Sequence, residues 1–258
     1  MLATVYTVAK SLLDPEVPAN AGYYRTLNIS APPGCVVGPV PPAAIGCRSI
    51  SASVLGDVIA NALSQAMPDK ALAASGPHHL YVLAGSDPRT GAYFVNYETL
   101  AGGMGARANR DGVDGVRVHA SGSSNLPVEA LEHAYPFRVE RYALWEGSAG
   151  TGQYRGGMGV VRDYRVLSDD IVVSLSSERQ NVAACGMQNG GDGACGAFIL
   201  NPDTPHAQKL PAASGEVALP KDSILRICTP SGAGYGDAAQ RDAAAAERDA
   251  REERLARN

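Results

Sequence analysis

The sequence has few aromatic residues and no excess of positive charge. Aromatic side chains make up 6% of its 258 residues, and the formal net charge at pH 7 is −4. Without a basic field to attract a polyanion, nucleic acid is not expected as a partner. The low aromatic content beside 29 glycines suits a chain that completes its core against another polypeptide.

Signals for disulfides, export and membrane insertion are also missing. The five cysteines are odd in number and show no C-x-x-C spacing, which argues against a disulfide framework. The apolar positions of residues 1–13 fall far short of the roughly 20 residues that a membrane span needs, and no charged-then-apolar leader opens the chain. We therefore expect a cytoplasmic protein with reduced thiols and no membrane partner.

Motifs for nucleotide, nucleophile or metal chemistry are not found in the sequence. It contains no G-x-x-x-x-G-K-[ST] phosphate loop and no G-x-S-x-G nucleophile elbow. His78 and His79 are adjacent, so on a strand their side chains point apart, and no carboxylate lies at ligand spacing. The chain thus offers no identifiable cofactor-binding residues and no metal ligands of its own.

Hydrophobic patterning and the positions of glycine and proline indicate an α+β fold that is rich in strands and glycine loops. Glycine (29) and proline (17) are abundant, which predicts many turns. Short helices are expected over residues 3–13, 54–67 and 128–135, with a charged helical tail over 238–258. Strands are expected over residues 25–30, 80–84, 93–100, 137–145, 160–167, 171–176, 196–200 and 223–228. Hairpin connections are predicted at residues 85–91, 168–170 and 201–209.

Residues 125–159 combine a helix, a charged strand and a glycine cluster. Glu129 and Glu132 lie three apart and share one face of the expected helix, and Glu140 follows on the strand. Two interpretations of these carboxylates stay open: a solvated surface, which is the commoner fate of charge pairs, or groups for acid–base work. Asn125 precedes the helix, where capping is the favoured role.

The glycine-rich loops allow two interpretations as well. Arg155, Gly156 and Gly157 could form tight turns only, or could bring bare backbone and a guanidinium close to an anion or another subunit. The loop that starts at Gly102 and Gly103 is either solvated or part of an interface or site.

This run resembles the hydantoinase B / 5-oxoprolinase family, whose members carry N-x-P-V-E-x-x-E, P-x-x-x-E-x-Y and S-G-G-x-G-x-x-R-G-G-x-G. The matching residues are Asn125, Pro127, Val128, Glu129, Glu132, Pro136, Glu140, Tyr142, Ser148, Gly150, Gly152, Arg155, Gly156, Gly157 and Gly159. Residues 13–22, 31–34, 102–112 and 229–237 resemble further family motifs in the same order. Ala149, Ser231 and Ala233 depart from the family's glycines, which restricts positive φ there.

The resemblance covers about residues 5–242, whereas family members are more than twice as long. It implies that residues 1–237 form the C-terminal part of a hydantoinase B/oxoprolinase-like domain, followed by a charged helical or frayed tail over 238–258. Related carboxylases hold a divalent metal in the N-terminal half, which this chain lacks. Whether the chain is a split subunit or a truncated gene is left open.

The function that the resemblance implies is that of a partial subunit of an ATP-dependent cyclic-amide hydrolase. A hydantoinase A-like partner would bind ATP in a hetero-oligomer that also includes the N-terminal half, and the isolated chain would be inactive. The alternatives are a non-catalytic structural or interaction fragment and part of an ATP-dependent ketone carboxylase. The expected catalytic residues are Glu129, Glu132 and Glu140. The expected substrate or interface residues are Asn125, Arg155, Gly156, Gly157, Gly102 and Gly103.

Overall fold

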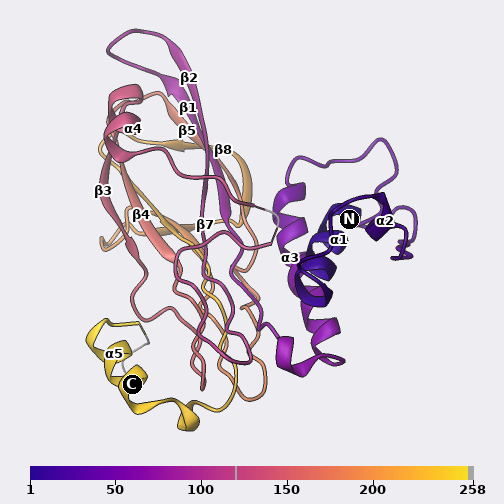
Figure 1. Cartoon of the computed structure of the whole chain (residues 1–258). Helices are drawn as coiled ribbons and strands as arrows, with labels where there is room; N and C mark the ends of the chain where they lie inside the picture. The colour runs from indigo at the N-terminus through magenta and orange to yellow at the C-terminus, as the bar shows by residue number, and fades with distance from the viewer. Residues whose placement is uncertain (120, 255–258) are drawn as a thin grey trace.

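Two antiparallel sheets form the body of the protein in a computed structural model that describes residues 1–119 and 121–254. One sheet has the strand order β2-β1-β5-β8 and the other β3-β4-β9-β6-β7 (Figure 1). The strands of the first are β1 (His79–Ser86), β2 (Tyr93–Leu100), β5 (Ile171–Ser176) and β8 (Ala213–Leu219). Those of the second are β3 (Phe137–Leu144), β4 (Val160–Val166), β6 (Ala197–Leu200), β7 (Gln208–Leu210) and β9 (Ile224–Cys228). The predicted α+β class is confirmed.

The main core lies between the two sheets, because each strand turns every second side chain inward. In β5, for example, Ile171, Val173 and Leu175 are buried while their neighbours are partly exposed. Both sheets contribute to a single apolar cluster. Its largest fully buried members are Tyr81, Leu83, Leu100, Leu131, Phe137, Tyr164, Ile171, Phe198, Leu219, Leu225 and Ile227.

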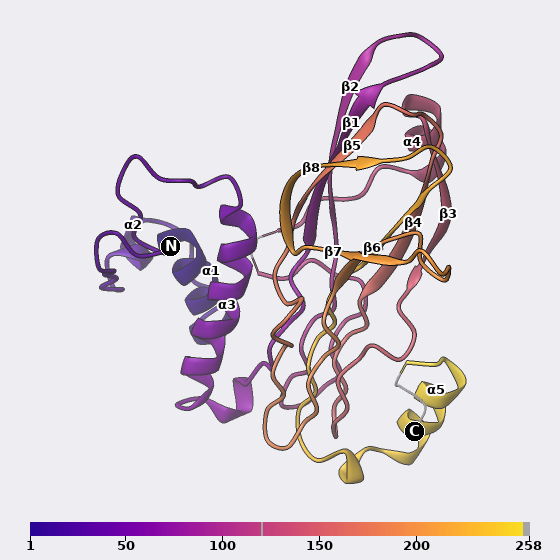
Figure 2. The ribbon, with the colours of Figure 1, turned by 180° about the vertical axis from the view of Figure 1, so that it is seen from behind.

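Extended glycine-rich segments continue beyond the sheets, at the end away from the β1–β2 hairpin (Figures 1 and 2). They are joined by backbone hydrogen bonds such as Gly103 N to Pro230 O (3.0 Å) and Gly157 N to Met104 O (2.7 Å). A Cβ atom on Gly157 would lie 2.0 Å from the carbonyl oxygen of Val113. The glycines are therefore needed because backbone packs directly on backbone.

Helices flank the sheets on two sides. Helix α1 (Leu2–Leu13) packs on α3 (Arg48–Ser64), with α2 (Ala21–Tyr24) and the 3₁₀ turn η1 (Pro68–Lys70) beside them. Helix α4 (Val128–Ala134) lies near the β1–β2 hairpin, and η2 (Ala238–Gln240) with α5 (Ala243–Arg251) lies beside the glycine-rich segments. In the part of the chain that the structure describes, no helix has the length and apolar character needed to cross a bilayer.

Most predicted elements are confirmed, but three expectations were wrong and one strand was missed. Residues 25–30 form no strand. Helix α3 begins at Arg48 rather than at residue 54, and β8 was not predicted. Ser168–Asp170 does not close a hairpin, because β4 and β5 belong to different sheets. The predicted β1–β2 and β6–β7 hairpins are present.

Candidate functional site

The three predicted catalytic glutamates lie on α4 and β3 and share no hydrogen-bond partner among the described residues. Glu129 is exposed in the first turn of α4, with no hydrogen bond or ion pair to another described residue. Glu132 Oε1 accepts a hydrogen bond from the backbone N–H of Val139 (2.8 Å), which ties α4 to β3. Glu132 is therefore engaged in holding these two elements together.

Glu140 sits between two arginines at an irregularity in β3. Its Oε1 accepts hydrogen bonds from Arg165 Nε (2.5 Å) and Arg138 Nε (2.9 Å). The hydrogen bonds from Arg165 and Arg138 lower the pKa of Glu140. Its carboxylate is thereby stabilised in the ionised form, which favours a base or a charge partner over a proton donor.

Asn125 does not cap α4, so that prediction was wrong. Pro127 occupies the N-cap position without a side-chain hydrogen bond. Asn125 Nδ2 instead donates to Glu98 Oε1 (3.0 Å) and to the carbonyl oxygen of Thr99 (2.7 Å). The side chain thus anchors the segment before α4 to strand β2.

Glu98 is the centre of a buried polar network between the sheets. Its Oε2 accepts hydrogen bonds from the hydroxyls of Tyr164 (2.8 Å) and Tyr81 (3.1 Å), and its Oε1 accepts one from Arg162 (3.1 Å). The Arg162 guanidinium is fully buried and lies over the rings of Tyr142 and Tyr164. Burial opposes ionisation of Glu98, but Arg162 and the hydrogen bonds outweigh it and lower the pKa of this carboxyl.

Sequence reasoning did not single out Glu98, although the pattern of β2 contains a signal. Asn96, Glu98 and Leu100 alternate along one face and are all buried. Tyr93 and Tyr97 occupy the other, exposed face. A strand that turns its polar residues inward and its aromatic residues outward is unusual. This inverted pattern could have identified Glu98 as a buried polar residue worth singling out.

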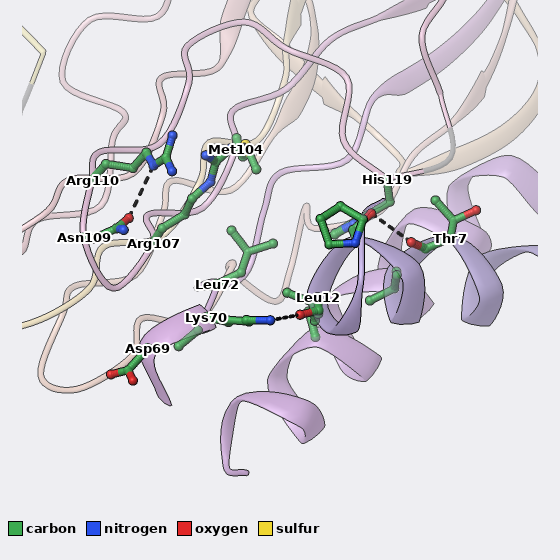
Figure 3. Close-up of a pocket in the computed structure, with 15 residues that line it drawn as sticks. Thr7, Leu12, Asp69, Lys70, Leu72, Met104, Arg107, Asn109, Arg110 and His119 are labelled. Atoms are coloured by element: carbon green, nitrogen blue, oxygen red, sulfur yellow. Dashed lines mark hydrogen bonds between the residues drawn. The ribbon is translucent and has the colours of Figure 1, made fainter. Parts of the chain in front are cut away.

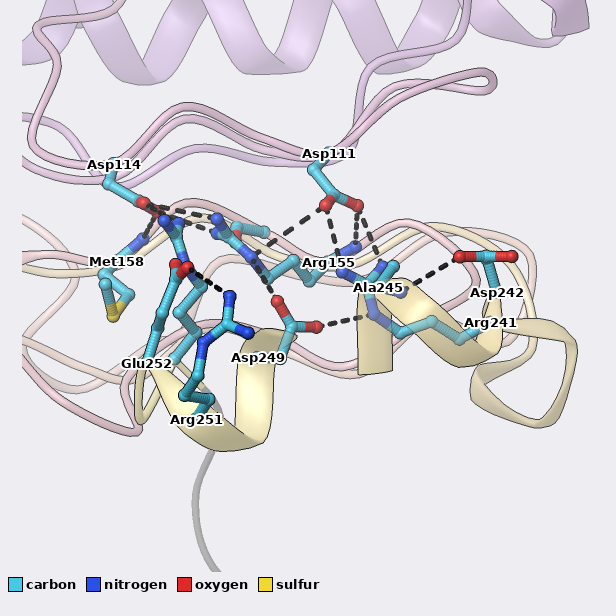
Figure 4. Close-up of polar contacts among 12 residues, drawn as sticks. Asp111, Asp114, Arg155, Met158, Arg241, Asp242, Ala245, Asp249, Arg251 and Glu252 are labelled. Carbon is cyan, nitrogen blue, oxygen red and sulfur yellow. Dashed lines mark hydrogen bonds and ion pairs between the residues drawn. The ribbon is translucent and has the colours of Figure 1, made fainter. Parts of the chain in front are cut away.

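Arg155 is buried in the glycine-rich region and is held by carboxylates of the same chain (Figure 4). Its guanidinium donates to Asp114 Oδ1 (2.7 Å) and forms an ion pair with Asp249 Oδ1 (3.3 Å). Arg241 bridges Asp111 and Asp249, at 2.9 and 2.6 Å. The Arg155 side chain therefore already has internal anionic partners.

The C-terminal tail supplies three members of this network: Arg241, Asp249 and Arg254. Asp249 of α5 is buried, and the side chain of Arg241 is almost entirely covered. Arg254 also pairs with Asp114. Of the helical tail expected over residues 238–258, Ala243–Arg251 form α5, and residues 255–258 lie outside the described residues. The tail is covered where Asp249 meets the glycine-rich segments.

Gly102, Gly103, Gly156 and Gly157 lie side by side in the glycine-rich region. A Cβ on Gly103 would meet the carbonyl oxygen of Gly157 at 2.0 Å, and one on Gly156 would meet that of Gly232 at 1.9 Å. A Cβ on Gly102 would meet Gly76 O at 2.2 Å. Close internal packing explains these glycines, and their role toward a substrate or interface stays a prediction.

His119 and Asp57 form a second polar cluster, which the sequence did not reveal. Asp57 is buried on α3 and accepts hydrogen bonds from His119 Nε2 (2.9 Å), Arg179 (2.9 Å) and the N–H of Ser75 (3.1 Å). His119 has a left-handed backbone (φ 59°), and its ring lies against Gly56. A histidine oriented by a buried carboxylate suits proton transfer or ligand binding.

His119 forms part of the wall of a cavity of about 540 Å³ between the N-terminal helices and the loop at residues 104–110 (Figure 3). Thr7, Leu12, Lys70 and Leu72 also line it. Among the described residues, no three His, Cys, Asp or Glu side chains gather closely enough to hold a metal ion.

Comparisons with known proteins agree with this fold. Residues 1–238 match the sequence model of the Hydantoinase B/oxoprolinase family. The chain belongs to the hydantoinase B/oxoprolinase family. It is 31% identical to the B-type subunit of a putative D-/L-hydantoinase from a Pseudomonas species, over 93% of this chain and 41% of that protein.

Two solved structures share the fold of this family member. An ATP-dependent caprolactamase from Pseudomonas jessenii superposes with a TM-score of 0.82 at 23% identity, over 98% of this chain and 45% of that one. A nucleotide-free acetone carboxylase gives a TM-score of 0.83 at 17% identity, over 97% of this chain and 38% of that one. The chain spans less than half the length of the curated relatives that it matches. Helix α5 lies beyond the family match.

Proposed function

We propose that this chain is the C-terminal part of the B-type subunit of an ATP-dependent enzyme that opens cyclic amides. The match of residues 1–238 to the hydantoinase B/oxoprolinase family carries the proposal. A relative named as the B-type subunit of a hydantoinase and the fold shared with a caprolactamase support it. We propose a cytoplasmic location and a hetero-oligomer with the N-terminal half and an A-type partner.

The proposed chemistry divides between chains. Amide resonance makes a ring carbonyl a poor electrophile, and transfer of a phosphoryl group to its oxygen would remove this protection. The ATP step is assigned to the A-type partner, because the sequence has no phosphate loop of the kind described above. A divalent metal, where one is used, is assigned to the N-terminal half.

Within this chain, Glu129 is the catalytic candidate whose carboxylate has no partner among the described residues. Glu132 and Glu140 would act from fixed positions, since each already accepts hydrogen bonds. Arg155 could contact an anion only after its ion pairs with Asp114 or Asp249 open. Asn125 and the four glycines would then shape the interface.

Reconstitution tests the proposed function. The chain is co-expressed with an N-terminal half and an A-type subunit from a relative, and ATP hydrolysis is measured with hydantoin, 5-oxoproline or caprolactam. We expect turnover by the complete complex and none by the 258-residue chain alone. Turnover of a cyclic amide by the isolated chain would contradict the proposal.

Glu129→Gln in that complex tests the catalytic assignment. Loss of a general acid or base lowers turnover by roughly 10²–10⁴-fold, so we expect a drop in this range with unchanged assembly. Glu247→Gln on the exposed surface of α5 is the matched control. Equal turnover by Glu129→Gln and wild type would show that Glu129 is not catalytic.

A ketone carboxylase is the second candidate, favoured by the fold shared with acetone carboxylase. The two functions differ in the substrate that stimulates ATP hydrolysis. A carboxylase complex would consume acetone and bicarbonate together, whereas a cyclic-amide hydrolase would not respond to bicarbonate. A non-catalytic fragment would leave the complex as active without this chain as with it.

A further inference from the structure

We propose that the cavity between α1, α3 and the turn at residues 107–110 binds a small molecule with an apolar body and one anionic head group. Arg107 and Arg110 would hold the head group, a carboxylate or a phosphate. This inference goes beyond the proposed function and does not depend on it.

A tight turn places the two arginines next to each other. The N–H of Arg107 donates to the carbonyl oxygen of Arg110 (2.9 Å), and Arg107 also pairs across an isolated bridge with Leu72. The N–H of Ala108 donates to the carbonyl oxygen of Ala71 (3.1 Å), which fixes the turn against the segment that follows η1. Both arginine side chains line the cavity.

Neither guanidinium has a carboxylate partner in the described part of the chain. The contact of Arg107 is with Met104 Sδ (3.4 Å), and that of Arg110 is with Asn109 Oδ1 (3.3 Å). Six partly covered or buried arginines elsewhere pair with a carboxylate: Arg155, Arg162, Arg179, Arg226, Arg241 and Arg254. Arg117 and Arg141 are also partly covered and form no ion pair with a described residue, but neither lines this cavity. The turn thus holds two positive charges without a counter-ion.

The electrostatics of the turn favour an added anion. Partial burial lowers the pKa of Arg107, and the nearby charge of Arg110 lowers it further. An oxyanion between the two guanidinium groups would relieve both effects, and arginine forks match the oxygens of carboxylate and phosphate. Asp69 also lines the cavity but forms no ion pair with a described residue, and Lys70 Nζ donates to the carbonyl oxygen of Leu12 (2.7 Å).

The rest of the cavity suits an apolar body. Val8, Leu12, Ala60 and Leu72 line it. Figure 3 shows the two guanidinium groups on one side, the His119 ring on the other, and Leu72 and Leu12 between them. Its volume of about 540 Å³ lies within the range of small-molecule pockets, roughly 300–1,000 Å³. The two arginines at one end of the cavity and the apolar side chains along it therefore suit a ligand with an anionic head group and an apolar body.

Calorimetric titration at low ionic strength tests the site in the full chain. The probes are pentanoate, butyl phosphate and, as the cationic counterpart, pentylammonium. We expect saturable binding of at least one anion and none of the cation, and the tighter anion identifies the head group. Loss of a charged hydrogen bond weakens binding by about tenfold or more, so Arg107→Gln and Arg110→Gln should each show such a loss.

Arg25→Gln is the control, since Arg25 is exposed and does not line the cavity. It should bind the anions like wild type. Because Arg107 is partly covered, its replacement could disturb the fold, and circular dichroism checks that Arg107→Gln is folded. If it is not, the test relies on Arg110→Gln, since Arg110 is exposed. Absence of anion binding, equal binding of pentylammonium, or unchanged affinity in the folded arginine variants would overturn the proposal.

Discussion

Between the two sheets, the buried negative charge of Glu98 is balanced by the buried positive charge of Arg162. Both side chains are buried, and the carboxylate of Glu98 also accepts from Tyr81, Tyr164 and Asn125. Removal of one member of a buried pair leaves the other charge unpaired in a medium of low polarity, which costs more than the pair contributes. The core therefore depends on Glu98 being ionised.

Glu98→Gln is expected to lower the free energy of unfolding by about 3 kcal/mol, because the buried Arg162 loses its counter-charge. Urea denaturation at pH 7 measures the loss. The folded-state pKa of Glu98 is lowered, so its contribution is present above the unfolded value and disappears as pH falls through the folded value. Glu129→Gln is the control, with an expected change within about 0.5 kcal/mol; equal stability of the two variants would contradict the role of Glu98.

His79 should make the protein less stable in mild acid. It is fully buried against Phe198, and burial lowers its pKa to about 3. The unfolded chain takes up a proton near pH 6.5 and the folded chain does not, so stability falls as pH drops below that value. Between pH 7 and 5 this one group accounts for about 2 kcal/mol of lost stability.

Urea unfolding of His79→Phe at pH 7 and pH 5 checks this prediction. The variant should lose about 2 kcal/mol less than wild type over this interval, whatever its absolute stability. The neighbouring His78, whose pKa is lowered to about 4, remains in both proteins and supplies the residual slope. Parallel pH profiles for the two proteins would show that His79 is not the titrating group.

Among the elements, the glycine-rich segments depend on the absence of side chains. Gly157→Ala would place a Cβ 2.0 Å from Val113 O, and we expect it to lower the free energy of unfolding by about 3 kcal/mol or more. Gly46→Ala is the matched control, because nothing lies within 4 Å of its added Cβ. It should be neutral or stabilising by up to about 1 kcal/mol. Similar denaturation midpoints for both variants would argue against close backbone packing.

Helix α5 is expected to stay docked through Asp249. Asp249→Asn removes the ion pairs to Arg155 and Arg241, so two nearly buried arginine side chains lose a counter-charge. Tryptic cleavage at Arg248 and Arg251, followed by mass spectrometry, should be about tenfold faster or more, because cleavage follows local opening. Glu247→Gln on the exposed surface of the same helix should cleave at the wild-type rate. An unchanged rate in Asp249→Asn would mean that other contacts hold α5.

Elements were predicted better than their pairing. Residue types located β1 and β2, because both are rich in tyrosine, valine and leucine. The turn chemistry of Ser168–Asp170 was correctly placed between two strands, yet it does not determine whether those strands share a sheet. Strand β8 contains Gly215 and weak strand formers, and its pairing with β5 stabilises it. Local sequence does not reveal that contact.

The site was predicted less well than the elements, because its contacts join distant residues. Asn125 pairs with Glu98 across 27 positions, and Asp57 with Arg179 across 122. Capping was a sound expectation for Asn125 from its neighbours alone. Partners at such separations become visible only once the sheets are assembled.

For the whole molecule, burial is uneven along the chain. Residues 14–47 contain no buried residue, and they expose apolar side chains such as Val36 (84% exposed). The outward face of the edge strand β2 exposes Tyr93, Val95 and Tyr97. Since the chain spans less than half the length of its relatives, these surfaces are where the proposed assembly would add contacts.

Hydrogen–deuterium exchange separates the stable body from this segment. In the isolated chain, amides of residues 14–47 should exchange orders of magnitude faster than those of β1, β4 and β9, because opening them exposes little apolar surface. In the reconstituted complex, the proposed function predicts new protection in residues 14–47 and along β2, while β4 and β9 stay unchanged as internal controls. Slow exchange of residues 14–47 in the isolated chain would mean that this segment is as stable as the two sheets. The prediction that low burial makes the segment locally unstable would then be wrong.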